Sequence, residues 1–178
     1  MFHRTTRLFL RPAWPEDWEA VLGGIADEGV VRNLARAPWP YGPDDAASFV
    51  SRAQEPMAPD FLVIHAASGT AIGCAGLGAV GAEVELGYWI ARQHWGRGYA
   101  TEAGAGVIEV ARALGHRRVT AGHFTDNPAS GRVLRKLGFR STGQIRPRMS
   151  CARGHAVPSV EYVRDLANDD TAPRMRAA

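Results

Sequence analysis

The chain has 178 residues, 46% of them hydrophobic and 22% charged, which is ordinary for one globular domain with its own core. The formal net charge is only +3 and the basic residues form no block or stripe, so the composition argues against nucleic-acid binding. No run approaches the roughly 18 apolar residues of a membrane span, and the first residues lack the apolar region of a signal peptide. We therefore expect a cytoplasmic protein, a monomer or homodimer, that binds neither nucleic acid nor membrane.

The first part of the chain predicts one strand followed by helices. Alternating residues predict a strand over 7–12, and "PEDWEAVLGGIA" (15–26) opens with the proline and acids of a helix start. A second helical segment over 27–37 leads into "APWPYGP" (37–43), where three prolines exclude regular structure. A further helix is predicted over 44–54.

The remainder predicts a mixed α/β order. Runs with strand character at hairpin spacing suggest an antiparallel meander over 61–67, 71–80 and 84–90. The pattern then predicts alternating helices and strands, namely a helix over 99–114, a strand over 117–124, a helix over 127–138 and strands over 139–145 and 157–166. We expect a single domain over 1–166, followed by a flexible tail over 167–178.

The two cysteines give no metal-ligand pattern. Cys74 and Cys151 form neither a CxxC nor a Cys/His spacing, and no other residues suggest a metal site. We expect two buried free thiols, in keeping with a reducing compartment.

The stretch "QHWGRGYAT" (93–101) places Gly96 and Gly98 between a predicted strand and a predicted helix. The first N–H groups of a helix lack intrahelical partners and carry partial positive charge, so they bind phosphate well. Glycine lets the backbone approach a ligand and adopt positive φ, and Arg97 adds a full charge. Taken alone, however, the two glycines are explained as well by an ordinary strand-to-helix turn.

A second helix start follows in "TDNPASGRVLRKLGF" (125–139). Asn127 suits the N-cap and Pro128 the first helical position, and this structural explanation covers most of the segment. Two successive strand-to-helix units would nevertheless place two positive helix ends beside one cleft.

Together these motifs resemble the GNAT acetyltransferase superfamily, in particular its RimJ/RimL-like branch of ribosomal-protein N-terminal acetyltransferases. Gln93-x-x-Gly96-x-Gly98 is similar to the family's pyrophosphate loop. As in the branch, "ELGYWI" precedes this loop and the similarity continues through "WGRGYATEA", and Asn127-x-x-Ser130 matches the following helix. The resemblance covers about residues 5 to 165. It implies an α/β (α+β) GNAT fold, with a mostly antiparallel mixed sheet of six to seven strands. The sheet would splay between its fourth and fifth strands, 84–90 and 117–124, with helices on both faces.

The resemblance also implies acetyl-CoA as the cofactor, lying in the splayed gap. The strand backbone would pair with the pantetheine arm, amides 96 to 100 would hold the pyrophosphate, Asn127 would contact the pantetheine and Ser130 would lie near the sulfur. The cofactor-binding residues it implies are Leu86, Tyr88, Ile90, Gln93, Trp95, Gly96, Arg97, Gly98, Tyr99, Ala100, Asn127 and Ser130.

Direct attack of an amine on a thioester needs a base for the amine and a hydroxyl for the departing sulfur. Glu85 is the candidate base, because a carboxylate among apolar strand neighbours beside a cleft is desolvated; an exposed glutamate without a role is the equal alternative. Ser130 is the candidate hydroxyl, although a serine in a first helical turn can simply serve the backbone. Tyr88 and Tyr162 are secondary candidates.

The acceptor is the least defined part. Trp39 and Tyr41, in the proline-rich loop, lie where this branch builds its acceptor pocket. The acceptor predicted first is a protein N-terminal α-amine. The alternatives are a small-molecule amine (a polyamine, an amino acid or an aminoglycoside) and a non-catalytic acyl-CoA sensor.

Overall fold

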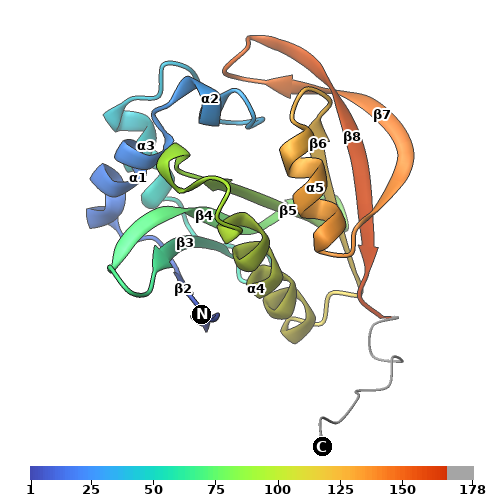
Figure 1. Ribbon diagram of the computed structural model, residues 1–178, viewed down its shortest axis with the longest axis horizontal. Helices are drawn as coiled ribbons and strands as arrows, with labels where there is room; N and C mark the ends of the chain where they lie inside the picture. Colours follow the sequence, from blue (N-terminus) through green and yellow to red (C-terminus); the bar gives the residue numbers. More distant parts are fainter. Residues whose placement is uncertain (168–178) are drawn as a thin grey trace, which may run out of the picture.

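The computed structural model describes residues 1–167, so the predicted tail lies, from residue 168 on, outside the described residues. The chain alternates between sheet strands and surrounding helices (Figure 1). The elements are β1 (His3–Arg4), β2 (Leu8–Arg11), η1 (Pro15–Asp17), α1 (Trp18–Ile25), α2 (Glu28–Val31), α3 (Pro43–Val50), β3 (Asp60–His65), β4 (Thr70–Val80), β5 (Glu83–Ile90), η2 (Arg92–His94), α4 (Tyr99–Ala113), β6 (Arg118–Phe124), α5 (Pro128–Lys136), β7 (Arg140–Ser150) and β8 (His155–Asp165).

The strands form one open sheet in the order β1-β2-β3-β4-β5-β6-β8-β7. Every neighbouring pair is antiparallel except β5 with β6, which confirms the predicted mostly antiparallel mixed sheet. The sheet has eight strands and not the predicted six to seven, because the two-residue β1 adds to one edge. So short a strand carries no alternating pattern that a sequence analysis can detect.

The gap in the sheet lies where the resemblance implied it. The parallel pair β5–β6 is in register only at Val84 with Val119 and at Glu85 with Thr120. Beyond Glu85 the two strands part, whereas β5 stays paired with β4 from Glu83 to Ile90. The β6-facing side of the second half of β5 is therefore open to a ligand.

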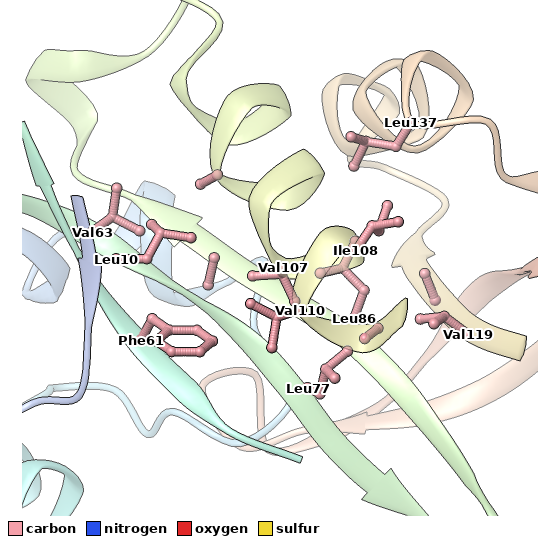
Figure 2. Close-up of a cluster of buried hydrophobic side chains, with 14 of the residues drawn as sticks. Leu10, Phe61, Val63, Leu77, Leu86, Val107, Ile108, Val110, Val119 and Leu137 are labelled. Atoms are coloured by element: carbon pink, nitrogen blue, oxygen red, sulfur yellow. The ribbon is translucent and has the colours of Figure 1, made fainter. Parts of the chain in front are cut away.

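Two apolar cores lie on opposite faces of the sheet, in keeping with the alternation of side chains along strands. One core joins the sheet to α4 and α5, and Figure 2 shows its centre, with Val107 and Ile108 of α4 over Leu77 and Leu86. The second core joins the other face to α1, α2 and α3 and includes Trp89. Helices thus cover both faces, as predicted, and each side of the gap has its own wall.

Two predicted helices are shorter than expected. The segment predicted as helical over 27–37 is helical only over Glu28–Val31, because Asn33 Nδ2 donates to Gly29 O at 2.7 Å and so terminates the helix. The helix predicted over 44–54 ends at Val50, and Arg52 turns away to pair with Asp60.

One predicted strand is longer than expected. The strand predicted over 139–145 runs on to Ser150 in β7, even though the chain contains Pro147. The proline is tolerated because β7 is an edge strand, whose outer side needs no N–H donor.

The expectation of two buried thiols is half wrong. Both cysteines are free, but only Cys74 is buried, while Cys151 is exposed. Cys151 follows Ser150 in the turn between β7 and β8, where its backbone N–H donates to the Ala35 carbonyl at 2.9 Å while its side chain stays exposed. Among residues 1–167, no helix is long and apolar enough to cross a membrane.

Candidate active site

A cavity of about 1090 Å³ follows the parted strands. Its walls come from the loop between α2 and α3, from α3, β4, β5, the turn before α4, β6 and α5. Residues from both faces of β5 line it, including Glu85 on one face and Tyr88 on the other. The cavity therefore connects the two sides of the sheet at the gap.

The turn into α4 has the geometry of an anion site. Gly96 and Gly98 both have positive φ, 74° and 80°, and Gly98 is the N-cap in the left-handed region. Within the part of the chain that the structure describes, the backbone N–H groups of 96 to 101 donate to no protein acceptor. Because α4 is 15 residues long, its dipole adds to these free donors, and a pyrophosphate fits here.

Two residues of the turn between β1 and β2 hold this glycine turn in place, a contact that the sequence analysis did not predict. Arg7 Nε donates to Glu102 Oε2 at 2.6 Å, and Arg7 Nη1 donates to the carbonyl of Arg97 at 3.1 Å. Thr5 Oγ1 donates to Glu102 Oε1 at 2.6 Å. Burial alone would raise the pKa of Glu102, but these hydrogen bonds outweigh it and lower that pKa. The ionised carboxylate thus ties the first turn of α4 to the turn between β1 and β2.

Tyr88 bridges the gap between β5 and α5. Its hydroxyl lies 2.8 Å from Ser130 Oγ and 3.3 Å from the Ser130 carbonyl oxygen. Burial raises the pKa of Tyr88 to about 12, although the Ser130 contact acts in the opposite direction. Tyr88 therefore keeps its proton at neutral pH and, with Ser130, forms a pair of hydroxyls inside the gap.

The start of α5 is built as the sequence predicted. Asn127 is the N-cap, and its Oδ1 accepts a hydrogen bond from the Ser130 N–H at 3.3 Å. α5 also lies very close to β6, since a Cβ on Gly131 would be 2.6 Å from His123 Nε2. This close approach places the Ser130 hydroxyl at the edge of the gap.

Glu85 lies on the face opposite Tyr88, but its surroundings differ from the expectation. Arg148 Nη1 donates to Glu85 Oε1 at 2.6 Å, and the Glu85 side chain is 16% exposed. Arg148 Nη2 is also 3.8 Å from Glu161 Oε1. The expected apolar surroundings are therefore wrong. The reason is tertiary, because Arg148 reaches across from β7, 63 residues further along the chain.

Three glycines give the cavity a bare floor beside Glu85. Gly78 is the register partner of Glu85, and Gly76 is the partner of Gly87, so all four share one face of β4 and β5. A Cβ on Gly87 would meet no atom within 4 Å. The glycine-rich β4 thus leaves room for an acceptor next to the carboxylate.

The far end of this floor carries a second ion pair. Asp60 is the register partner of Gly76, and its carboxylate pairs with the Arg52 guanidinium, which lies 5.0 Å from the centre of the Phe49 ring. Burial raises the pKa of Asp60, whereas Arg52 opposes that shift. Tyr41 also lines this end, and burial raises its pKa to about 12.

The structure brings most of the sequence-predicted residues together. Those that line the cavity are Tyr41, Glu85, Leu86, Tyr88, Ile90, Trp95, Gly96, Gly98, Tyr99, Ala100, Asn127 and Ser130. Trp39, Gln93 and Arg97 are not part of the lining and are exposed. Trp95 Nε1 donates to the Ile90 carbonyl at 2.6 Å, so this indole also fixes the end of β5.

The other titratable groups near the cavity suggest structural roles. His123 Nδ1 lies 2.8 Å from the carbonyl oxygen of Phe124, and its ring packs against Tyr162 at 5.5 Å between centroids. Arg135 Nη1 donates to the Tyr162 hydroxyl at 3.3 Å, which draws that hydroxyl away from the Tyr88–Ser130 pair. Residues 1–167 contain no group of three or more His, Cys, Asp or Glu placed to hold a metal ion.

Comparison with known proteins identifies the family. Residues 7–140 match the acetyltransferase (GNAT) domain, and the N-acetyltransferase YoaA of Bacillus subtilis (strain 168) is 31% identical, over 82% of this chain and 86% of its own length. The chain belongs to the GNAT acetyltransferases and is an acetyl-CoA-dependent N-acetyltransferase.

Solved structures share its fold. A GNAT-family acetyltransferase from Bacillus anthracis superposes with a TM-score of 0.82 at 22% identity, over 93% of this chain and 99% of that chain. The ribosomal L7/L12 α-N-protein acetyltransferase RimL, solved with coenzyme A, superposes with a TM-score of 0.74 at 20% identity, over 94% and 99%. Identities this low concern the fold and not the acceptor.

Proposed function

We propose that this protein acetylates a primary amine by direct attack, with Glu85 as the general base and the Tyr88–Ser130 pair on the side of the leaving sulfur. One observation carries the proposal: the cavity passes through the gap between β5 and β6, with a carboxylate on one face and paired hydroxyls on the other. The amine then approaches from the α1–α3 side and acetyl-CoA from the α4–α5 side. We also propose that residues 1–166 form one acetyltransferase domain, in a cytoplasmic protein.

The donor side would use backbone groups for binding. The free N–H groups of 96 to 101 would donate hydrogen bonds to the pyrophosphate oxygens, and the open side of β5 from Leu86 to Ile90 would pair with the pantetheine arm. When bound, acetyl-CoA supplies an activated acetyl group, whose C–S bond breaks as the C–N bond to the amine forms. Asn127 keeps the Ser130 segment in place at the gap.

Glu85 would remove the proton that keeps the amine unreactive. Amines with a pKa of about 8 to 10 are mostly protonated at neutral pH and have no lone pair for attack. The ammonium would lose one proton to Glu85, directly or through water. A second proton is lost as the amide forms, and the thiolate takes one, so each turnover releases one net proton.

Arg148 would hold the Glu85 carboxylate in position before the amine arrives, because its Nη1 donates to Glu85 Oε1 at 2.6 Å. The departing thiolate would receive its proton from Tyr88, which is protonated at neutral pH and held by Ser130. The proposed base, Glu85, and the proposed acid, Tyr88, thus lie on opposite faces of β5, so the strand keeps Tyr88 from giving its proton directly to Glu85.

The acceptor has two candidates. A protein N-terminal α-amine agrees with the shared fold of RimL. A small-molecule amine agrees with the enclosed floor of glycines and with the ion pairs around it. Both need the same base and the same gap, so acetyl transfer itself can be tested before the acceptor is known.

The test follows release of free thiol from acetyl-CoA with a panel of amino acids, amino acid amides, polyamines, aminoglycosides and short peptides. Thiol release that depends on both the protein and an acceptor is expected. Stabilisation of the fold by acetyl-CoA without thiol release for any acceptor would instead favour a non-catalytic acyl-CoA sensor.

The base is tested with Glu85→Gln and a matched control, Glu83→Gln. Glu83 lies two residues away on the same strand and face, pairs with Arg118 at 3.5 Å and is outside the cavity lining. We expect Glu85→Gln to lower kcat by about 100-fold or more and to remove the acidic limb of the pH–rate profile, with Glu83→Gln close to wild type. A wild-type pH profile for Glu85→Gln would remove Glu85 from this role.

A further inference from the structure

One guanidinium in the acceptor half of the cavity has no partner. Arg36, in the loop between α2 and α3, is solvent-exposed, lines the cavity and makes no hydrogen bond or ion pair with any residue in 1–167. Its charge acts on Asp60 only at a distance, and Arg52 makes the direct contact with that carboxylate. The cavity's other pairs are complete, since Arg148 is shared between Glu85 and Glu161.

Arg36 lies on the same face of the sheet as Glu85, the proposed base, and close enough for one small molecule to reach both. Arg36 Nη2 lies 3.8 Å from the point where a Cβ on Gly78 would be, and Gly78 is the register partner of Glu85. Opposed residues on one face of a sheet have Cβ positions about 5 Å apart, so the guanidinium is within about 9 Å of the Glu85 Cβ. Only the glycine floor lies beneath this space, and above Gly87 it is open.

A second polar group without a partner lies on the same face. Ser159 Oγ is fully buried, lines the cavity and has no hydrogen-bond partner within the described chain. It and Arg148 Nη2 both lie over Gly122, at 3.0 Å and 3.4 Å from where a Cβ of that glycine would be. Buried hydroxyls are seldom left without a partner, so this one is available to a water molecule or to a polar group of a ligand on the face that carries Arg148.

We infer that the acceptor is an amino-acid-like molecule, whose amine lies at Glu85 and whose carboxylate binds the Arg36 guanidinium. This inference rests on the proposed function and specifies its acceptor. The planar fork of arginine binds a carboxylate through two parallel hydrogen bonds, which aligns the amine as well as attracting the molecule. A polyamine would place a second cation against Arg36, and a peptide N-terminus would offer it a neutral amide.

The test compares proteinogenic amino acids with their own C-terminal amides, and adds putrescine and a peptide with neutral side chains. We expect wild-type protein to prefer the carboxylate over the matched amide by at least tenfold in kcat/KM. Arg36→Met should remove that preference, mainly by raising KM for the carboxylate, and should leave the amide unchanged. Arg36→Lys should retain part of it, and Arg4→Met, on the distant edge strand β1, should behave as wild type.

Two kinetic results would overturn the inference. One is a wild-type preference for amides, putrescine or the peptide; the other is an equal loss for carboxylate and amide in Arg36→Met, which would indicate a structural role. Calorimetric binding of the amino acids to the coenzyme A complex separates this question from turnover. If no acceptor releases thiol, the proposed function fails. Binding that depends on Arg36 would still support the carboxylate site, and binding that ignores Arg36 would refute it.

Discussion

The left-handed glycine at the start of α4, Gly98, allows the coenzyme site to be tested through its backbone conformation. Gly98 has φ 80° and ψ 3°, and a Cβ there would contact Arg7 Nη2 at 3.6 Å, an ordinary van der Waals distance. The penalty of Gly98→Ala is therefore in the backbone, about 1–2 kcal/mol for an L-residue in this region. The turn can relieve that strain only by re-aiming the N–H groups that would hold the pyrophosphate.

The same helix provides a matched control. Gly115 lies just beyond the end of α4 with φ 84°, and a Cβ there would meet no atom within 4 Å. Gly115→Ala should lower the free energy of unfolding by the same 1–2 kcal/mol, but it lies outside the cavity lining. The two variants thus introduce the same backbone strain, one at the proposed coenzyme site and one away from it.

The expected difference is in coenzyme affinity. If all of the strain at Gly98 is relieved by movement of the turn, binding weakens by about 1–2 kcal/mol, a factor of roughly 5 to 30 in Kd. Calorimetric titration with coenzyme A gives Kd, and urea unfolding gives the stability of each variant. Unchanged affinity in Gly98→Ala, or an equal loss in Gly115→Ala, would refute the assignment of this turn to the pyrophosphate.

Three further predictions concern single groups. Tyr88→Phe should lower kcat by about 100-fold at nearly unchanged coenzyme affinity, whereas a wild-type kcat would exclude proton donation by Tyr88. Because the pKa of Glu102 is lowered in the folded state, its stabilisation is present above the ordinary value of 4.5 and is lost as the pH falls below it. In urea titrations, Glu102→Gln should therefore lessen the loss of stability on acidification below pH 4.5. Burial raises the pKa of the Cys74 thiol far above its usual range, so a thiol reagent should modify Cys151 in the folded protein and Cys74 only after unfolding; equal rates would contradict the packing.

Short-range patterns account for most of the agreement between sequence and structure. The helix start at Asn127 depends on residues within one turn, and the glycine turn at Gly96 and Gly98 depends on φ values that side chains disfavour. Each of these signals is complete within a few neighbouring residues. The prediction of a helix over 27–37 was wrong for a similarly local reason, because the Asn33 side chain competes for the Gly29 carbonyl within the helix.

The chemistry around these elements was decided over longer distances. Arg7 reaches Glu102 across 95 residues, Arg148 reaches Glu85 across 63, and Tyr88 meets Ser130 across 42. No spacing rule relates residues so far apart, because their meeting depends on the strand order β5-β6-β8-β7 and on where α5 packs. The sequence pattern predicted apolar surroundings for Glu85, whereas in the folded protein the edge strand β7 places the Arg148 guanidinium against it.

The sequence by itself determined the alternation of strands and helices, the two capped helix starts and the family, because each is written in residues close together in the chain. The tertiary structure alone decided what surrounds Glu85, which hydroxyls face each other in the gap, and that Arg36, beside a floor of glycines, has no partner within residues 1–167. Those properties arise from side chains brought together by sheet register and helix packing, and both are set by the whole core.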